Sequence, residues 1–488
     1  MNSPTDYIQS LVCNICWSGP FAQKGFRSLV KGDQVEYKTT WSQVQQSADH
    51  GCGLCSLLVE EDELLPEDHK DDVCFLLRLS QIYPTNGIGV HLTPFYTECL
   101  QIEIEDEIGT GNSGYLLYTS SGSADDPSAQ EIAAREPMRD VQSPQCFSLA
   151  LECLDDCIKN HQKCPKPTLD ARLPTRVIDC SDPSRPKLFA SQGTNASYVA
   201  LSYVWGGTQP NCTTTKNLEI YTSAGINPDF VPETVQDAIQ VTNRLGFRYL
   251  WADAFCIIQD SAEDKKTELI QLRRIFRDAH FTIIASCAES ASVGFLKTRA
   301  PPANPPPRLP FWCKDGRLGI VSTHPMFPYD ARDEPANQRA WCLEERLLSA
   351  RKLVYASDTL HYHCQSNMAP IGGSISFPRY GEKLSDVMFL SDVAISAHVA
   401  GWNYHDRRSL QLTWGDIIRN YTTREVTKLE DKLTALAGVA EQYNRVWRLI
   451  DSGTNNETDV GRGYLAGLWK RSLKQDLLWK RCEAEAIG

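Results

Sequence analysis

The sequence has no run of basic residues, and this absence narrows the classes of partner that the protein can bind. Its 61 acidic and 49 basic residues give a net charge of −12. The basic residues gather only in pairs such as Arg273–Arg274 and Arg407–Arg408. Because nucleic acids and anionic membrane surfaces both attract clustered lysine and arginine, we expect neither as a general partner.

Long apolar runs are also missing. No segment approaches the roughly 20 apolar residues that a membrane-spanning helix needs. The first residues carry neither the basic segment nor the apolar core of a secretion signal. These absences predict a cytoplasmic protein without a membrane span, in which the 18 cysteines are thiols or metal ligands rather than disulfides. The P-loop, HExxH and GxSxG motifs are absent as well, which removes three familiar signatures of catalysis.

The 488 residues divide by composition into four stretches. Residues 1–108 form a Cys-rich region with both helical and strand patterns. Residues 109–145 are rich in glycine, serine and acidic residues, and they predict a mobile loop. Residues 146–365 have an α/β pattern that a proline-rich insertion at 301–310 interrupts. Residues 366–488 are predicted to be mostly helical.

The central stretch alternates between strand and helix patterns. Short apolar strands are predicted at 198–204, 248–254 and 280–287. Amphipathic helices are predicted between them, at 232–245 and 264–279. Strands that alternate with helices in this way form a parallel sheet with crossover helices, so we expect an α/β fold.

Four cysteines near the N-terminus form two C-x2-C pairs. They are Cys13 with Cys16, and Cys52 with Cys55. Four thiolates from two such pairs can close a tetrahedral zinc site, which would be structural. The alternative interpretation is four reduced, buried thiols. No strand–CxxC–helix pattern supports a redox role.

A second group of ligand-type residues lies near the end of a predicted helix. Cys157, His161 and Cys164 follow one helix face by their spacing. They can bind a metal with a fourth ligand, for which Cys180 and Cys153 are the candidates. The alternative interpretation is a packed cysteine pair beside a hydrogen-bonded histidine.

Aromatic, polar and acidic residues gather where two predicted strands end. In open parallel sheets, ligands bind beyond the carboxyl ends of the strands. The set therefore predicts a pocket for a sugar or a nucleotide. The structural alternative is that the tryptophans belong to the core and that the aspartate caps a helix. The residues are Ser202, Tyr203, Trp205 and Gly206 after the first strand, and Trp251 and Asp253 at the second.

Three segments resemble, in the same order, the blocks of the fungal heterokaryon incompatibility (HET) family. They are YVALSYVWGG at 198–207, the long segment from VPETVQDAI to FTIIAS at 231–286, and RAWCLEERLLSARKLVY at 339–355. The resemblance implies a role in non-self recognition, programmed cell death and fungal innate immunity. It also implies self-association and an unidentified protein partner or trigger.

The HET family is in turn similar to TIR domains, which implies a TIR-like or flavodoxin-like parallel sheet. The stretch WCLEER resembles the TIR segment whose glutamate cleaves NAD in the enzymatic members. On that match Glu345 is the catalytic residue, and NAD is a substrate rather than a cofactor. The alternative is a non-enzymatic signalling module that acts through self-association and keeps only a vestigial pocket.

Overall fold

The computed structural model separates the chain into two compact units. The N-terminal unit combines Met1–Val141, Thr298–Asp330 and Ala369–Tyr380, and the central unit combines Gln142–Lys297, Ala331–Met368 and Gly381–Gly488. The residues that the structure describes are 4–60, 73–82, 85–86, 90–91, 99–106, 112–120, 125–167, 171–325, 329–375, 383–452 and 463–473.

The N-terminal unit is built on an antiparallel sheet of six strands. Their order is β1 (Val35–Thr39), β2 (Val73–Ile82), β5 (Cys99–Asp106), β6 (Asn112–Tyr118), β13 (Leu318–Pro325) and β12 (Arg308–Trp312). Two-residue strands β3 (Thr85–Asn86) and β4 (Val90–His91) pair separately. The helices are α1 (Pro4–Gln9), α2 (Asn14–Ser18), α3 (Gln23–Val30), α4 (Trp41–Asp49) and α5 (Gly53–Glu60).

Two segments of this unit differ from the sequence-based expectation. Strand β6 lies inside the stretch 109–145, for which a mobile loop was expected, although residues 107–111 and 121–124 lie outside the described residues. Its run Tyr115–Tyr118 is buried. A short strand that is covered on both faces is apolar throughout and does not alternate between apolar and polar residues, so its sequence lacks the usual strand pattern. The proline-rich insertion at 301–310 leads into β12, so it serves the N-terminal unit rather than the α/β core.

The central unit is built on a mixed sheet of eight strands, which confirms the α/β class. The four inner strands are mutually parallel: β14 (Arg351–Tyr355), β11 (Phe281–Ile284), β9 (Tyr198–Ser202) and β10 (Tyr249–Trp251), in that spatial order. Outer strands extend the sheet, with β15 (Leu360–Cys364) and β16 (Met368–Pro370) beyond β14, and β7 (Arg176–Asp179) and β8 (Lys187–Ala190) beyond β10. The pairings of β14 with β15, β10 with β7 and β7 with β8 are antiparallel.

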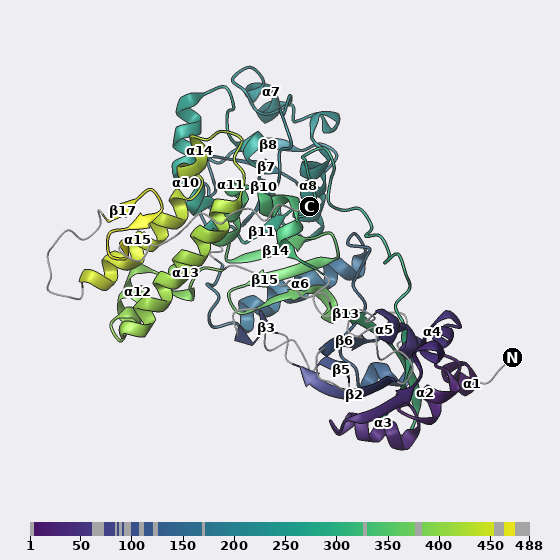
Figure 1. Ribbon diagram of the computed structural model, residues 1–488. Coiled ribbons are helices and arrows are strands. Elements are labelled where there is room, and N and C mark those ends of the chain that lie inside the picture. Colours follow the sequence, from purple (N-terminus) through teal and green to yellow (C-terminus); the bar gives the residue numbers. More distant parts are fainter. Residues whose placement is uncertain are drawn as a thin grey trace. The chain divides into compact units, whose positions relative to one another are not determined.

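Helices cover this sheet (Figure 1). Helix α8 (Glu233–Arg244) buries Val235, Ala238 and Ile239 and packs against β9 and β10. Helix α10 (Ala262–Asp278) begins at Ser261, whose side chain accepts a hydrogen bond from the backbone N–H of Asp264. Helix α11 (Ala340–Leu348) packs against α10 and β9, and α6 (Pro144–Asn160) packs against β15.

The last part of the central unit is mostly helical within the described residues. It contains α12 (Asp392–Val399), α13 (Tyr404–Thr423), α14 (Asp431–Thr434) and α15 (Ala437–Ser452), followed by the hairpin of β17 (Tyr464–Leu465) and β18 (Leu468–Trp469). Two short helices, α7 (Leu218–Ser223) and α9 (Asp253–Cys256), lie between the strands. Within the described residues, no helix combines the length and apolar character that crossing a bilayer requires.

Candidate functional site

An acidic and an aromatic side chain meet beyond the carboxyl ends of β9 and β10. Trp205 follows β9, and its Nε1–H donates to both carboxylate oxygens of Asp253, at 3.2 Å and 2.9 Å. Asp253 is the first residue of α9, directly after β10, and both side chains are half-buried. Burial raises the pKa of Asp253 to about 6, although the nearby Tyr203 hydroxyl and the hydrogen bonds from the Ala254 N–H and Trp205 lower it.

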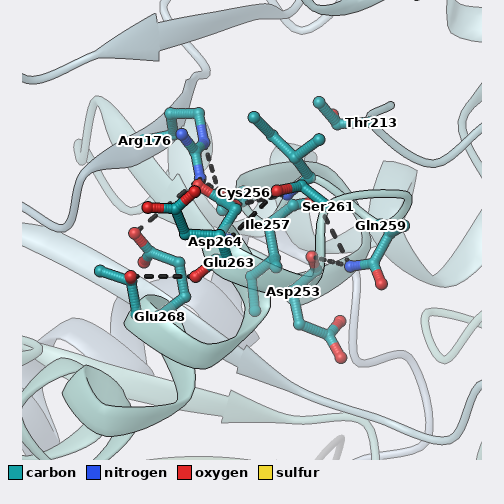
Figure 2. Close-up of polar contacts among 12 residues, drawn as sticks. Arg176, Thr213, Asp253, Cys256, Ile257, Gln259, Ser261, Glu263, Asp264 and Glu268 are labelled. Carbon is teal, nitrogen blue, oxygen red and sulfur yellow. Dashed lines mark hydrogen bonds and ion pairs between the residues drawn. The ribbon is translucent and has the colours of Figure 1, made fainter. Parts of the chain in front are cut away.

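The loop that presents Asp253 is held mainly through its backbone (Figure 2). Gln259 donates from its side-chain amide to the carbonyl of Asp253 at 3.0 Å, and Thr213 donates from its hydroxyl to the carbonyl of Phe255 at 2.6 Å. Arg176 pairs with Asp264 at the start of α10. Figure 2 shows the Asp253 carboxylate turned away from that ion pair. The carboxylate instead accepts hydrogen bonds from the Trp205 indole and the Ala254 N–H.

Glu345, on α11, lies near Ser202 and Asp253, although neither acidic residue is among those that line the cavity described below. Burial raises its pKa to about 8; the neighbouring Ser202 hydroxyl lowers it, and the charge of Asp253 raises it further. The residue is half-buried, and its Oε2 atom is fully covered. Within the described part of the chain Glu345 forms no ion pair, since Arg346 donates to Asn337 and Arg339 donates to Thr427.

The neighbouring carboxylate, Glu344, has a different environment. It accepts hydrogen bonds from the backbone N–H groups of Gly438 at 2.8 Å and Val439 at 3.4 Å, at the start of α15. An anion at a helix N-terminus satisfies free N–H groups and interacts favourably with the helix dipole. Burial raises the pKa of Glu344 to about 7, and these hydrogen bonds lower it. Of the two adjacent glutamates, only Glu345 faces Ser202 and Asp253.

Three of the remaining predicted pocket residues are buried. Ser202, at the end of β9, and Tyr203 are buried near Glu345 and Asp253. Burial raises the pKa of Tyr203 well above its usual value, and the Asp253 charge adds to this effect. The Ser202 and Tyr203 hydroxyls make no hydrogen bond of ordinary geometry within the described residues. Trp251 packs edge-on against Phe276, with ring centroids 5.5 Å apart, so it belongs to the core and the expectation of a pocket-lining role is corrected.

A cavity of about 300 Å³ opens beside Trp205. Its walls come from the loop after β9, the segment before α8, helix α9 and the loop after β11. A cavity of this size lies at the lower end of small-molecule sites. The lining includes Trp205, Gly206, Gly207, Gln209, Asn211, Cys212, Asp229, Phe230, Phe255 and Ser290.

Gly206 allows the loop after β9 to approach the loop after β11. Its φ of +69° is the left-handed region that favours glycine. A Cβ atom added at Gly206 would lie only 2.1 Å from the Cβ of Ser290. The glycine therefore fixes the wall that carries Trp205.

We expect Gly206→Ala to lower the free energy of unfolding of the protein by about 2 kcal/mol or more, because it combines backbone strain with a steric clash. Chemical denaturation of the variant beside the wild type measures this loss. Gly401→Ala is the control, since Gly401 has no positive φ and no atom lies within 4 Å of a Cβ added there. Equal losses in both variants would contradict the packing argument.

The four N-terminal cysteines come together as predicted from their spacing. The ligand atoms of Cys13, Cys16, Cys52 and Cys55 all lie within 4.8 Å of one another. The Sγ of Cys16 is 3.4 Å from that of Cys13 and 3.7 Å from those of Cys52 and Cys55. A tetrahedral zinc ion with Zn–S bonds of ~2.3 Å places sulfurs roughly 3.8 Å apart. The arrangement is therefore compatible with a metal site.

The second group, Cys157, His161 and Cys164, is also brought together, but with a different fourth residue. Cys364, at the end of β15, completes a set whose ligand atoms all lie within 4.8 Å of one another. The expectation that Cys153 or Cys180 supplies the fourth ligand is therefore wrong. No local spacing links Cys364 to the other three, because antiparallel pairing and the packing of α6 on β15 create the contact.

Sequence reasoning also missed the residues that complete the crevice. Cys342 is buried on α11, and its Sγ lies 3.6 Å from the carbonyl oxygen of Tyr203, which it can reach as a donor. Phe230 and Phe255 line the cavity from segments that the strand-end argument did not consider. Cys342 could have been found from the sequence, because it lies in the same amphipathic segment as Glu345.

Comparison with protein-family models matches residues 198–345 to the family described as Heterokaryon incompatibility protein (HET). The matched segment begins at β9, includes the loops that carry Trp205 and Asp253, and ends at Glu345. No curated protein and no solved structure matches the chain.

Proposed function

We propose that this chain, whose residues 198–345 match the heterokaryon incompatibility family, acts in fungal non-self recognition and cell death by hydrolysing NAD at the nicotinamide–ribose bond. The observation that carries the proposal is that Trp205 both lines the cavity and holds the Asp253 carboxylate, near which Glu345 lies. The order of the parallel strands, β10-β9-β11-β14, supports a doubly wound core, because it corresponds to 2-1-3-4 in chain order.

The chemistry suits the residues of the crevice. Nicotinamide leaves NAD as a neutral molecule, so cleavage of its bond to ribose needs little acid assistance. Positive charge develops on the ribose, and the Glu345 carboxylate can stabilise it electrostatically. Water then adds to the ribose carbon and releases a proton, which gives ADP-ribose. Trp205 offers an aromatic face beside the cavity on which a flat ring can stack.

The raised pKa of Glu345 predicts how the reaction depends on pH. The stabilising form is the carboxylate, and its population in the free protein rises with pH up to a pKa of about 8. Below that pH, kcat/KM for NAD should therefore fall about tenfold per pH unit. Nicotinamide release measured from pH 5.5 to 9 tests this slope. Constant kcat/KM across pH 6 to 8 would contradict the assigned role of Glu345.

Incubating concentrated, purified protein with NAD and measuring nicotinamide by chromatography tests the function itself. We expect release that requires protein and yields ADP-ribose in equal amount. The alternative is a non-enzymatic signalling module that works by self-association. An absence of release from the full chain, at every protein concentration tested, would favour this alternative.

The N-terminal cysteines support a separate proposal, that Cys13, Cys16, Cys52 and Cys55 hold one structural zinc ion. The Tyr37 hydroxyl lies 3.3 Å from the Sγ of Cys16 and supplies an additional polar contact to the cluster. Four protein ligands leave no open position for water, so the site suits a structural role rather than hydrolysis. A metal-dependent hydrolase is accordingly the least supported of the possible functions.

A further inference from the structure

We propose that Cys157, His161, Cys164 and Cys364 bind a second zinc ion, which joins the end of helix α6 to strand β15. The first three residues come from the end of α6 and the loop after it. Cys364 is contributed by a strand about 200 residues later in the chain. All four side chains are buried.

The distances within the cluster fit a tetrahedral ion. His161 Nδ1 is 3.3 Å from the Sγ of Cys364 and 3.7 Å from that of Cys164. With Zn–S bonds of ~2.3 Å and Zn–N bonds of ~2.0–2.1 Å, a tetrahedral site places nitrogen and sulfur roughly 3.6 Å apart. The set has one nitrogen and three sulfurs, a combination that zinc prefers.

The histidine is oriented in the manner of a metal ligand. Its Nδ1 faces the sulfurs, while its Nε2 lies 3.3 Å from the Asp156 carboxylate, one turn earlier on α6. A carboxylate on the far ring nitrogen fixes the tautomer and ring orientation of a ligating histidine. A packed cysteine cluster without a metal would not need this arrangement.

The sulfurs also receive polar contacts that suit thiolates. The backbone N–H of Asn367 donates to the Sγ of Cys364 at 3.2 Å, and the Ser366 hydroxyl lies 3.5 Å from the Sγ of Cys164. Zinc binding converts the three thiols to thiolates and releases their protons to solvent. No position remains open for water, so the ion is structural.

The site would stabilise the part of the central sheet near β15, the strand next to its edge. Strand β15 pairs with β14, which follows directly after α11. Arg351, on β14, donates to the carbonyl of Pro165 at 2.6 Å, next to the ligand Cys164. A zinc ion at this point connects the α6 end to the segment that follows Glu345. The proposal does not depend on NAD hydrolysis.

Metal content of the full chain tests the proposal. We expect about two zinc ions per wild-type chain, one in Cys364→Ser and one in Cys16→Ser, measured by elemental mass spectrometry. Cys180→Ser is the control and should keep two, because Cys180 is equally buried but lies outside the cluster. Wild-type zinc content that Cys364→Ser leaves unchanged would overturn the site, as would a disulfide among Cys157, Cys164 and Cys364 in protein purified under non-oxidising conditions.

His161→Cys keeps the proposal testable if Cys364→Ser fails to fold. This variant retains four ligands, so it should fold and bind the second ion. In cobalt-substituted protein, exchange of the nitrogen ligand for sulfur should move part of the visible absorption to longer wavelength. Identical cobalt spectra for His161→Cys and the wild type would exclude His161 as a ligand and overturn the assignment.

Discussion

Glu345→Gln should reduce nicotinamide release from NAD by about 100- to 1,000-fold or more. The amide keeps the size and shape of the side chain but cannot carry the negative charge that faces the developing cation. Loss of one such electrostatic contribution typically costs a reaction this much. The residue lies beside Asp253 and Ser202 and forms no ion pair among the described residues, so its charge has no other evident structural use. Single-turnover measurements of nicotinamide release give the ratio.

The adjacent glutamate provides the matched control. Glu344 lies on the same helix, but it accepts hydrogen bonds from Gly438 and Val439. An amide oxygen can still accept these bonds, so Glu344→Gln should fold and retain nicotinamide release within a few-fold of the wild type. Equal losses in the two variants would indicate a general disturbance of α11 and remove the special role of Glu345.

Loss of the zinc ion that we propose for Cys13, Cys16, Cys52 and Cys55 should unfold the N-terminal unit. Apparent binding free energies of structural zinc are roughly 10–16 kcal/mol, whereas a folded domain is stable by only about 5–15 kcal/mol. The cysteines lie within the hydrophobic core of this unit, beside Tyr37 and Leu54. Cys16→Ser should therefore lose one zinc ion and expose the unit to limited proteolysis, read as cleavage within residues 1–60.

Cys313→Ser separates metal loss from the cost of changing a buried cysteine. Cys313 is buried in the same core but lies outside both clusters. The variant should keep its zinc and its resistance to protease. Cleavage that is as rapid in Cys313→Ser as in Cys16→Ser, with zinc retained in both, would contradict a structural zinc at this site.

Burial of Glu345 should also make the folded protein less stable at high pH. The folded-state pKa of Glu345 is raised to about 8, so its neutral form is favoured by folding. That contribution is fully present below the unfolded pKa of about 4.3, and it is lost as the pH rises through about 8. Glu345→Gln should therefore be more stable than the wild type at pH 9, by about 1–2 kcal/mol after allowance for solvent screening. Denaturation at pH 5 and pH 9 measures the difference.

The alternation of strands and helices in the central stretch could be predicted because each element has a local signal. Helix α8 follows Pro232 and buries one face, and Gly246 ends it with a φ of +82°. The placement of Asp253 beyond β10 followed from the rule for parallel sheets. The position of Glu345 came from the resemblance alone, since the spacing within α11 does not say which glutamate turns toward the crevice.

Contacts between distant segments had no such signal. Strand β13 pairs with β6 across about 200 residues and β12 pairs with β13, so the proline-rich segment could not be assigned to the N-terminal unit from its sequence. Cys364 joins Cys157 for the same reason. Trp251 was placed in a pocket because it lies near the end of a strand, but the alternation of side chains along β10 directs it toward Phe276.

Calorimetric titration of NAD into Glu345→Gln protein tests most directly whether the crevice is a dinucleotide site, because it separates binding from chemistry. We predict binding by this variant, and an affinity at least tenfold weaker when Trp205→Ala is added, since the indole both lines the cavity and holds Asp253. Trp341→Ala, on the same helix as Glu345 but outside the cavity lining, is the control. The absence of NAD binding, or an affinity that Trp205→Ala leaves unchanged, would contradict the assignment of this crevice.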